Sequence, residues 1–211
     1  MRIQKHVGIY GGSFDPIHFG HLNTAIEIME YHGLDEVWFC PAQINPHKLD
    51  TVSIAAHHRL KMLEFALDSI PYFGIIANEL NRPGPSYTID TLRELVEEQK
   101  YAPDPSKFFL ILGEDSLPGF FRWKDPLEII KLAPPLVAKR FISREEIDLI
   151  GDPDVCEALK KGLTPTHIME VSATRIRERV RRGLYIGHLV PAKVVDYIYQ
   201  NHLYSLDSNL K

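Results

Sequence analysis

Two histidines three residues apart, His18 and His21, follow a glycine pair in V-G-I-Y-G-G-S-F-D-P-I-H-F-G-H-L (residues 7–22). The segment is typical of a short buried strand, a loop hinged at Gly11 and Gly12, and the first turn of a helix. Residues at i and i+3 of a helix share a face, so both imidazoles are expected to point at one spot above the helix N-terminus. The amides and partial positive charge of a helix N-terminus favour an anion there. The segment therefore predicts a phosphate site.

The loop between the glycines and the histidines differs from two common nucleotide-binding patterns. It matches neither G-x-G-x-x-G nor G-x-x-x-x-G-K-[ST], which excludes the dinucleotide fingerprint and the P-loop. Asp15 and Pro16 predict a turn, with Pro16 near a first-turn position of the next helix. That helix is expected to begin near Ile17 and to end at Gly33. The simpler interpretation is a glycine turn before two solvated histidines. It does not explain why the glycine pair, the Asp15-Pro16 turn and the two histidines occur together at the start of a predicted helix.

The composition is that of an ordinary globular chain. The 211 residues are 45% hydrophobic and 25% charged, which predicts one domain over residues 1–211, with about residues 180–211 as a small helical subregion. A net charge of −4 argues against a protein that coats nucleic acid. Cys40 and Cys156 are far apart, which argues against a disulfide framework, a structural zinc site or a catalytic thiol. With no signal-peptide pattern and no apolar run of membrane-spanning length, a cytoplasmic location and no membrane partner are expected.

Strand and helix patterns alternate along the chain. This alternation predicts the α/β class: a Rossmann-like, doubly wound parallel sheet with helices on both faces. Ligands of such sheets bind beyond the carboxyl ends of the strands, where the strand order reverses. After the opening strand, further strands are expected at residues 36–40, 73–77, 107–113, 135–140 and 167–171. The later helices are expected from near Ser53 to Leu67, at 88–98, up to Gly183 and from Pro191 onward; two of them should bury Ala56, Leu60, Leu63 and Leu67, and Ile89, Leu92 and Val96.

A second polar element lies near the other end of the chain, at residues 171–182. Ser172 and Thr174 are plausible helix-capping residues, and Ile176 with Val180 forms an inward stripe. The element carries five arginines, at positions 175, 177, 179, 181 and 182. Successive odd positions on a helix lie roughly 200° apart, so these side chains scatter around the axis. Most are expected on the solvated surface, and no nucleic-acid partner is expected.

Several segments together resemble a known enzyme family. G-G-S-F-D-P-I-H-F-G-H-L is similar to the H-x-G-H signature of the nucleotidylyltransferase superfamily. Nearly the whole chain resembles bacterial nicotinate-mononucleotide adenylyltransferases, through P-H-K (46–48), P-S-Y-T (85–88), L-G-E-D-S-L (112–117) with Trp123 beyond it, and V-S-A-T-R-I-R (171–177). The H-x-G-H signature is specific only to the superfamily. The P-S-Y-T and tryptophan segments make the narrower identification.

The resemblance implies transfer of the adenylyl group of ATP to nicotinate mononucleotide, with release of pyrophosphate, in NAD biosynthesis. It implies that His18 and His21 contact the ATP phosphates as catalytic residues, with backbone amides from Gly12 to Phe14 beside them. The ATP-binding residues that it implies are Gly11, Gly12, Ser13, Phe14, Gly113, Asp115, Ser172, Thr174 and Arg177. The residues that it implies for the mononucleotide are Lys48 for the phosphate, Thr88 as a hydrogen-bond donor and Trp123 for the ring. Mg²⁺ is expected with ATP, held by substrate oxygens and water, so no protein ligand of a metal is named.

Each of these residues also has a purely structural interpretation. Without the resemblance, Asp115 could cap the next helix, Trp123 could be a half-buried core residue, and Lys48 could be an ordinary surface lysine. Ser13 stands where threonine is frequent in the family. Asn45 replaces the first proline of a common P-P-H-K, which puts the rigidity of that loop in doubt.

Two other functions remain open from the sequence. One is another adenylyltransferase of the superfamily, acting on nicotinamide mononucleotide or on phosphopantetheine. The other is a non-catalytic nucleotide sensor, against which the intact His18, His21, Ser172 and Arg177 argue. The oligomeric state is undetermined, with a homo-oligomer as one candidate, and residues 142–166 carry no motif.

Overall fold

The computed structural model describes residues 4–44, 53–82, 84–139, 141–148, 151–167 and 169–205. Within these ranges, six parallel strands form one sheet in the order β3-β2-β1-β4-β5-β6. The strands are β1 (His6–Gly12), β2 (Glu36–Pro41), β3 (Phe73–Ile75), β4 (Lys107–Gly113), β5 (Pro135–Lys139) and β6 (Leu163–Pro165). The direction of winding reverses between β1 and β4, where Tyr10 pairs with Ile111. This order confirms the predicted Rossmann-like fold.

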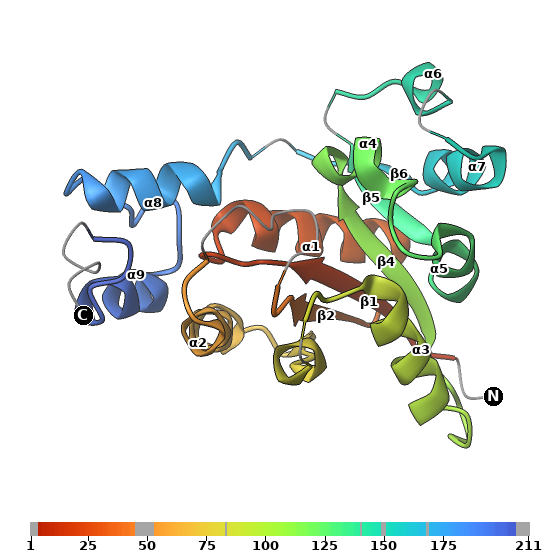
Figure 1. Cartoon of the computed structure of the whole chain (residues 1–211), viewed down its shortest axis with the longest axis horizontal. Coiled ribbons are helices and arrows are strands. Elements are labelled where there is room, and N and C mark those ends of the chain that lie inside the picture. Colours follow the sequence, from red (N-terminus) through yellow and green to blue (C-terminus); the bar gives the residue numbers. More distant parts are fainter. Residues whose placement is uncertain are drawn as a thin grey trace.

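Helices flank the sheet on both sides (Figure 1). α8 and α9 lie together at one end of the molecule, while α5, α6 and α7 lie toward the β6 end. The α-helices are α1 (Phe19–His32), α2 (Ala56–Leu67), α3 (Thr88–Glu98), α4 (Leu117–Phe120), α5 (Pro126–Leu132), α6 (Arg144–Ile147), α7 (Pro153–Lys161), α8 (Ala173–Arg181) and α9 (Ala192–Gln200). Two short 3₁₀ helices are η1 (Asn78–Asn81) and η2 (Glu114–Ser116).

The sheet separates two hydrophobic cores, because successive side chains of a strand point to opposite faces. On β4, Phe108, Leu110 and Leu112 join the core that α3, α5 and α7 cover. Ile111 points the other way, into the core covered by α1, α2, α8 and α9. Both faces of β4 are therefore buried, as its continuous apolar sequence predicts.

Most predicted elements lie where the patterns place them, and two differ. α1 ends at Gly33, whose φ of 61° is the left-handed conformation that glycine accepts. That helix begins at Phe19, so the prediction of a start near Ile17 was wrong, and Pro16 lies outside the helix. The prediction of a strand at 167–171 was also wrong among the described residues. The sixth strand is β6, which pairs with β5 through Val137 and Leu163.

Two of the predicted inward stripes need correction at single positions. On α3 the buried residue is Leu95, while Val96 is 40% exposed. On α2 Leu60 is only partly buried, and Arg59 beside it is buried. α9 follows its prediction, with Val194, Val195 and Ile198 inward.

Candidate active site

The loop after β1 opens onto a large cavity at the carboxyl edge of the sheet. Gly12 lies against the ring of Phe14, and a Cβ at Gly12 would lie 2.9 Å from that ring. Phe14 itself has a φ of 47° and is 2% exposed. The side chain of Phe14 therefore belongs to the core, packed on Tyr10 and Phe39. Phe14 is nevertheless among the residues that line the cavity.

His18 and His21 interact with each other at the start of α1, through two hydrogen bonds and the stacking of their rings. His18 is the N-cap, with φ −149° and ψ 168°, so the prediction that both lie within the helix was wrong for His18. Its Nδ1 accepts the His21 N–H at 3.3 Å, and the Nδ1 of His21 accepts the His18 N–H at 3.3 Å. The two rings stack with centroids 3.6 Å apart and planes 18° apart. The i, i+3 spacing brings the imidazoles together, through a reciprocal capping box.

This pairing sets the chemistry of both rings. An Nδ1 that accepts a hydrogen bond leaves the proton of a neutral imidazole on Nε2. Each ring is thus arranged as an N–H donor, the form that suits a phosphate oxygen. Gly20 makes the stacking feasible, because a Cβ there would lie 3.1 Å from Nδ1 of His18.

Arg177 on α8 reaches the same loop from far along the chain. Its NH1 donates to the carbonyl oxygen of Asp15 at 2.7 Å, and its NH2 donates to Oγ1 of Thr174 at 3.2 Å. The buried carboxylate of Asp15 accepts the hydroxyl of Tyr204 at 2.6 Å. Burial, together with the Asp15 charge, raises the pKa of Tyr204. Asp15 and Tyr204 were not predicted as part of the site. Ser172 is the N-cap of α8 by position, but its side chain makes no capping bond.

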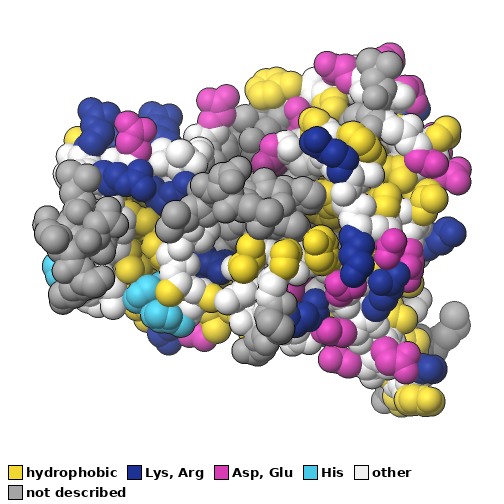
Figure 2. Space-filling model, in the orientation of Figure 1, with side chains coloured by type: hydrophobic (Ala, Val, Ile, Leu, Met, Phe, Trp, Pro, Cys, Tyr) yellow, Lys and Arg dark blue, Asp and Glu magenta, His cyan; other side chains and the backbone are white. Residues whose placement is uncertain are grey.

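The other arginines of α8 behave as the helical geometry predicts. Figure 2 shows lysine and arginine side chains gathered over α8. Arg175 and Arg181 are exposed, and Arg182 is ion-paired with Glu178 at 3.8 Å. Arg179 donates twice to the carbonyl oxygen of Tyr185, which closes the end of the helix. Arg177 is the arginine of this helix that lines the cavity.

The opposite side of the cavity holds residues predicted for the mononucleotide. Thr88 is the first residue of α3, and Trp123 is a partly buried residue after α4. The indole packs on Phe120 with centroids 5.0 Å apart. Lys124, next in sequence, donates to the Asp90 carboxylate at 2.9 and 3.0 Å, which holds the tryptophan loop to α3. Lys48 lies outside the described residues.

All of these segments enclose one cavity of about 800 Å³. That volume lies in the range of small-molecule sites. Asp115 lines it just beyond the carboxyl end of β4, beside Gly113. The predicted site residues along its wall are Gly11, Gly12, Ser13, Phe14, His18, His21, Thr88, Gly113, Asp115, Trp123, Ser172, Thr174 and Arg177. The cavity therefore lies at the predicted edge of the sheet, beside the β1–β4 reversal.

Arg59 is a third residue that sequence reasoning missed, after Asp15 and Tyr204. It is 2% exposed, and its guanidinium donates to four main-chain carbonyl oxygens, including that of Ser13 at 2.8 Å. Burial lowers the pKa of Arg59, and the nearby Asp15 carboxylate opposes that shift. The sequence does carry a signal: Arg59 lies three residues after Ala56 and four before Leu63, on the apolar face of α2.

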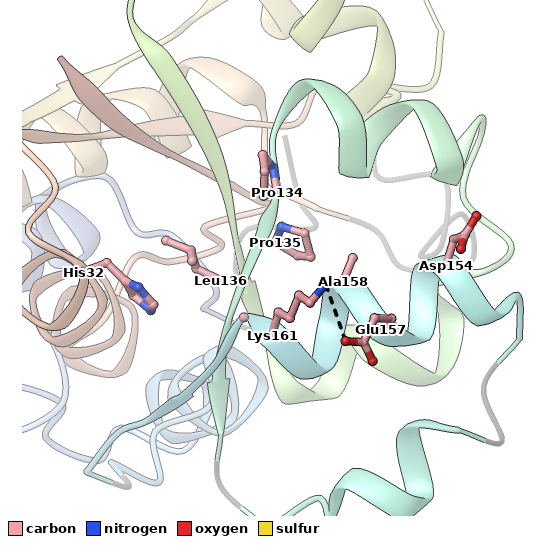
Figure 3. Close-up of a pocket in the computed structure, with 9 residues that line it drawn as sticks. His32, Pro134, Pro135, Leu136, Asp154, Glu157, Ala158 and Lys161 are labelled. Atoms are coloured by element: carbon pink, nitrogen blue, oxygen red, sulfur yellow. Dashed lines mark ion pairs between the residues drawn. The ribbon is translucent and has the colours of Figure 1, made fainter. Parts of the chain in front are cut away.

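A smaller hollow of about 390 Å³ lies where β5 begins (Figure 3). His32 from the end of α1, Pro135, and Lys161 from the end of α7 line it. In the close-up Lys161 points to Glu157, with which it is ion-paired at 3.5 Å. This hollow lies at the amino end of the strands. The lysine that lines it, Lys161, is already ion-paired with Glu157. The described residues that were predicted to bind nucleotide line the larger cavity.

Both cysteines are buried and free. Burial, with the Glu79 carboxylate beside it, raises the pKa of the Cys40 thiol, which disfavours the reactive thiolate. Among the described residues, no group of three or more His, Cys, Asp or Glu side chains is placed to hold a metal ion. The described helices include none that is long and apolar enough to cross a membrane.

Comparison with known proteins shows the family to which this chain belongs. The cytidylyltransferase-like family model matches residues 9–179. The chain is 40% identical to a probable nicotinate-nucleotide adenylyltransferase of Salinibacter ruber, over 94% of this chain and 97% of the relative. It is 38% identical to the nicotinate-nucleotide adenylyltransferase of Bacillus subtilis, over 95% and 98% of the two chains.

Solved structures share the fold across the same length. A Plasmodium falciparum nicotinic acid mononucleotide adenylyltransferase complexed with NaAD superimposes with a TM-score of 0.72 at 20% identity, covering 95% of this chain and 98% of the other. A putative nicotinate-nucleotide adenylyltransferase from Vibrio parahaemolyticus has a TM-score of 0.68 at 15% identity, with coverage of 96% and 97%. The solved structures show the fold, and the sequence matches, which cover nearly the whole chain, also show the family. The chain belongs to the nicotinate-nucleotide adenylyltransferase family of cytidylyltransferase-like proteins.

Proposed function

We propose that this protein transfers the adenylyl group of ATP to nicotinate mononucleotide, giving nicotinate adenine dinucleotide and pyrophosphate. The observation that carries the proposal is the stacked pair of His18 and His21, facing the same cavity as Arg177. Two imidazole donors and a guanidinium converge where a polyphosphate would lie. Family membership supplies the identity of the second substrate.

In the proposed mechanism, a phosphate oxygen of the mononucleotide attacks the α-phosphorus of ATP. The new P–O bond forms as the bond to the bridging oxygen of the β-phosphate breaks, and pyrophosphate leaves with that electron pair. The nucleophile is an anion at neutral pH, so no residue needs to remove a proton. Catalysis then consists of aligning two anions and stabilising the charge that develops on the leaving group. His18 and His21 donate hydrogen bonds through Nε2 to these oxygens.

The remaining cavity residues divide between the two substrates. We place the ATP phosphates along Gly11 to Phe14, with Ser172, Thr174 and Arg177 closing the site from α8. Gly113 and Asp115 are assigned to the nucleoside part of ATP.

The mononucleotide is assigned to the other side of the cavity. The indole of Trp123 offers a flat surface to the pyridine ring. Thr88 offers a hydroxyl and the start of a helix to its carboxylate. Lys48, by family resemblance, is assigned to the mononucleotide phosphate.

Mg²⁺ fits this donor set as a companion of ATP. A hard cation of this kind keeps water ligands and binds substrate phosphates, so it needs no protein cage. The wall of the cavity is rich in cationic and N–H groups, His18, His21 and Arg177, which suit phosphate oxygens more than a metal. When bound, the ion would neutralise phosphate charge. We propose a cytoplasmic location for the enzyme.

Pyrophosphate release tests the function and its alternatives together. The purified protein is supplied with ATP, Mg²⁺ and one acceptor: nicotinate mononucleotide, nicotinamide mononucleotide or phosphopantetheine. We expect the highest kcat/KM with nicotinate mononucleotide. A higher value with another acceptor would reassign the substrate, and ATP binding without turnover on any acceptor would indicate a nucleotide sensor.

A further inference from the structure

Arg59 joins two loops that border different parts of the cavity. Its NH1 donates to the carbonyl oxygen of Ser13 at 2.8 Å and to that of Ala42 at 2.7 Å. Its NH2 donates to the carbonyl oxygen of Gln43 at 3.2 Å, and its Nε donates to that of Ile54 at 3.3 Å. One buried guanidinium thus spans the loop after β1, the loop after β2 and the entry to α2.

The loop after β2 continues this connection to the mononucleotide side. The Gln43 N–H donates to Oγ of Ser86 at 2.9 Å, and the Ser86 N–H donates to the carbonyl oxygen of Ile44 at 3.0 Å. Ser86 is buried and lies two residues before Thr88. A continuous set of hydrogen bonds therefore runs from Ser13, which the proposed function assigns to the ATP phosphates, to Ser86, just before the start of α3.

The loop after β2 also meets the end of β1 directly, since the Ala42 N–H donates to the carbonyl oxygen of Gly12 at 2.9 Å. That single bond fixes one point of contact. The planar guanidinium of Arg59 adds hydrogen bonds to the carbonyl oxygens of Ser13, Ala42 and Gln43, in fixed directions. The ammonium group of a lysine, on its flexible stem, would not reproduce them. Arg59 therefore gives the two loops one shared, buried hydrogen-bond donor.

We propose that Arg59 is a positioning residue that couples the two substrate sites, so that ATP binding fixes residues 42–44 after β2 and Ser86 before α3, and thereby tightens binding of the mononucleotide. This inference rests on the proposed function, because it takes the loop after β1 to serve ATP and the start of α3 to serve the mononucleotide. Arg59 touches neither substrate. It acts through the main chain of Ser13 and of Ala42 and Gln43.

The test measures how each ligand changes the affinity for the other. Calorimetry gives the Kd of nicotinate mononucleotide with and without a saturating ATP analogue that has a methylene between its α- and β-phosphorus atoms. In the natural protein we expect the analogue to tighten mononucleotide binding by about 5- to 50-fold, within the usual range of coupling between sites. Linkage requires the same factor when the order of addition is reversed. A factor of one in both orders would overturn the proposal.

Two variants assign the coupling to the guanidinium. Arg59→Lys keeps the charge and Arg59→Gln keeps polar atoms, and both should reduce the coupling factor to near one. Arg179→Lys is the matched control, because Arg179 also donates to a main-chain carbonyl but contacts neither loop. The control should keep the coupling factor of the natural protein. Folded Arg59 variants with undiminished coupling would overturn the proposal, whatever their thermal stability.

Hydrogen exchange on the natural protein keeps the test decisive if both Arg59 variants fail to fold. The ATP analogue alone should slow amide exchange at Gln43 and Ser86, as well as in residues 11–14. Protection confined to the loop after β1 and to α1 would overturn the coupling. These readouts use no turnover, so they separate this inference from the proposed function. Absence of pyrophosphate release would contradict the function alone, and an active enzyme without coupling would contradict only the role of Arg59.

Discussion

The reciprocal bonds of His18 and His21 give two donors in a fixed geometry before any substrate arrives. Donors that are already oriented cost no reorganisation during the reaction, and this is why such groups stabilise developing charge strongly. The stacked arrangement also explains Gly20 between them, where a side chain would press on the His18 ring.

Replacing His18 tests its donor apart from its capping role. Loss of one such donor typically lowers kcat about 100- to 1,000-fold, and we expect that loss for both His18→Ala and His18→Asn. Only alanine should also lower the stability, by about 1 kcal/mol, since asparagine is a good N-cap. Steady-state kinetics and denaturant unfolding give the two effects. Near-normal kcat in either folded variant would contradict the assignment.

Trp123 is expected to act on one substrate only. Trp123→Ala should raise the KM for nicotinate mononucleotide about tenfold, because stacking of a base on an aromatic side chain contributes about 1–3 kcal/mol. The KM for ATP should change little. Trp38→Ala is the control, because Trp38 lies on β2 and does not line the cavity. Equal changes in both KM values after Trp123→Ala would indicate a general loss of packing.

At the scale of elements, α8 brings one arginine to the loop after β1 and leaves its neighbours in solvent. The angular spacing of the helix makes this selection, since Ile176 is buried and fixes which face turns inward.

The short helices α6 and α7 complete the far side of the sheet. Ser143 and Glu146 form a capping box there, in a region without any family motif.

Arg177→Ala should raise the KM for ATP or lower kcat, by about tenfold or more, because it removes a cation and a tether to Asp15. Arg181→Ala serves as the control on the exposed side of the same helix. It should change neither constant measurably. Unchanged constants in Arg177→Ala would assign that arginine to the solvated surface as well.

At the scale of the whole molecule, the C-terminal segment is tied to the first loop. The hydrogen bond from Tyr204 to Asp15 joins residues 189 positions apart. α9 also packs on α2, where His58 and the Tyr197 hydroxyl are 2.9 Å apart. Within the described part of the predicted subregion, residues 180–205 contribute apolar side chains to the core that α1 and α2 cover, and a single domain over the whole chain stays a prediction.

Tyr204→Phe should lower the free energy of unfolding at neutral pH by about 1.5–3 kcal/mol, the usual contribution of a hydrogen bond to a charged group. The folded-state pKa of Tyr204 is raised, so this contribution is complete below the ordinary tyrosine pKa of about 10 and is lost as the pH rises above it. Denaturant unfolding of both proteins at pH 8 and about pH 11 measures the difference. A difference that does not shrink at the higher pH would contradict this origin.

Local sequence patterns predicted much of the secondary structure of this protein. The strand at 107–113, the helix at 88–98 and the end of α1 at Gly33 all follow from neighbouring residues, because side-chain periodicity and glycine conformation act over one or two turns. The H-x-G-H segment predicted the superfamily, and the P-S-Y-T and tryptophan segments predicted the narrower family, because each is a short stretch that can be read from neighbouring residues.

Long-range packing decided the rest. No periodicity indicates that β6 is Leu163–Pro165, since that short strand forms only by pairing with β5. Nor could spacing show that the Tyr204 hydroxyl reaches Asp15, or that carbonyl oxygens of Ser13, Ala42 and Gln43 surround Arg59. These contacts join residues far apart in sequence, and a buried polar group finds its partners only when the tertiary fold excludes water and brings them within hydrogen-bonding distance.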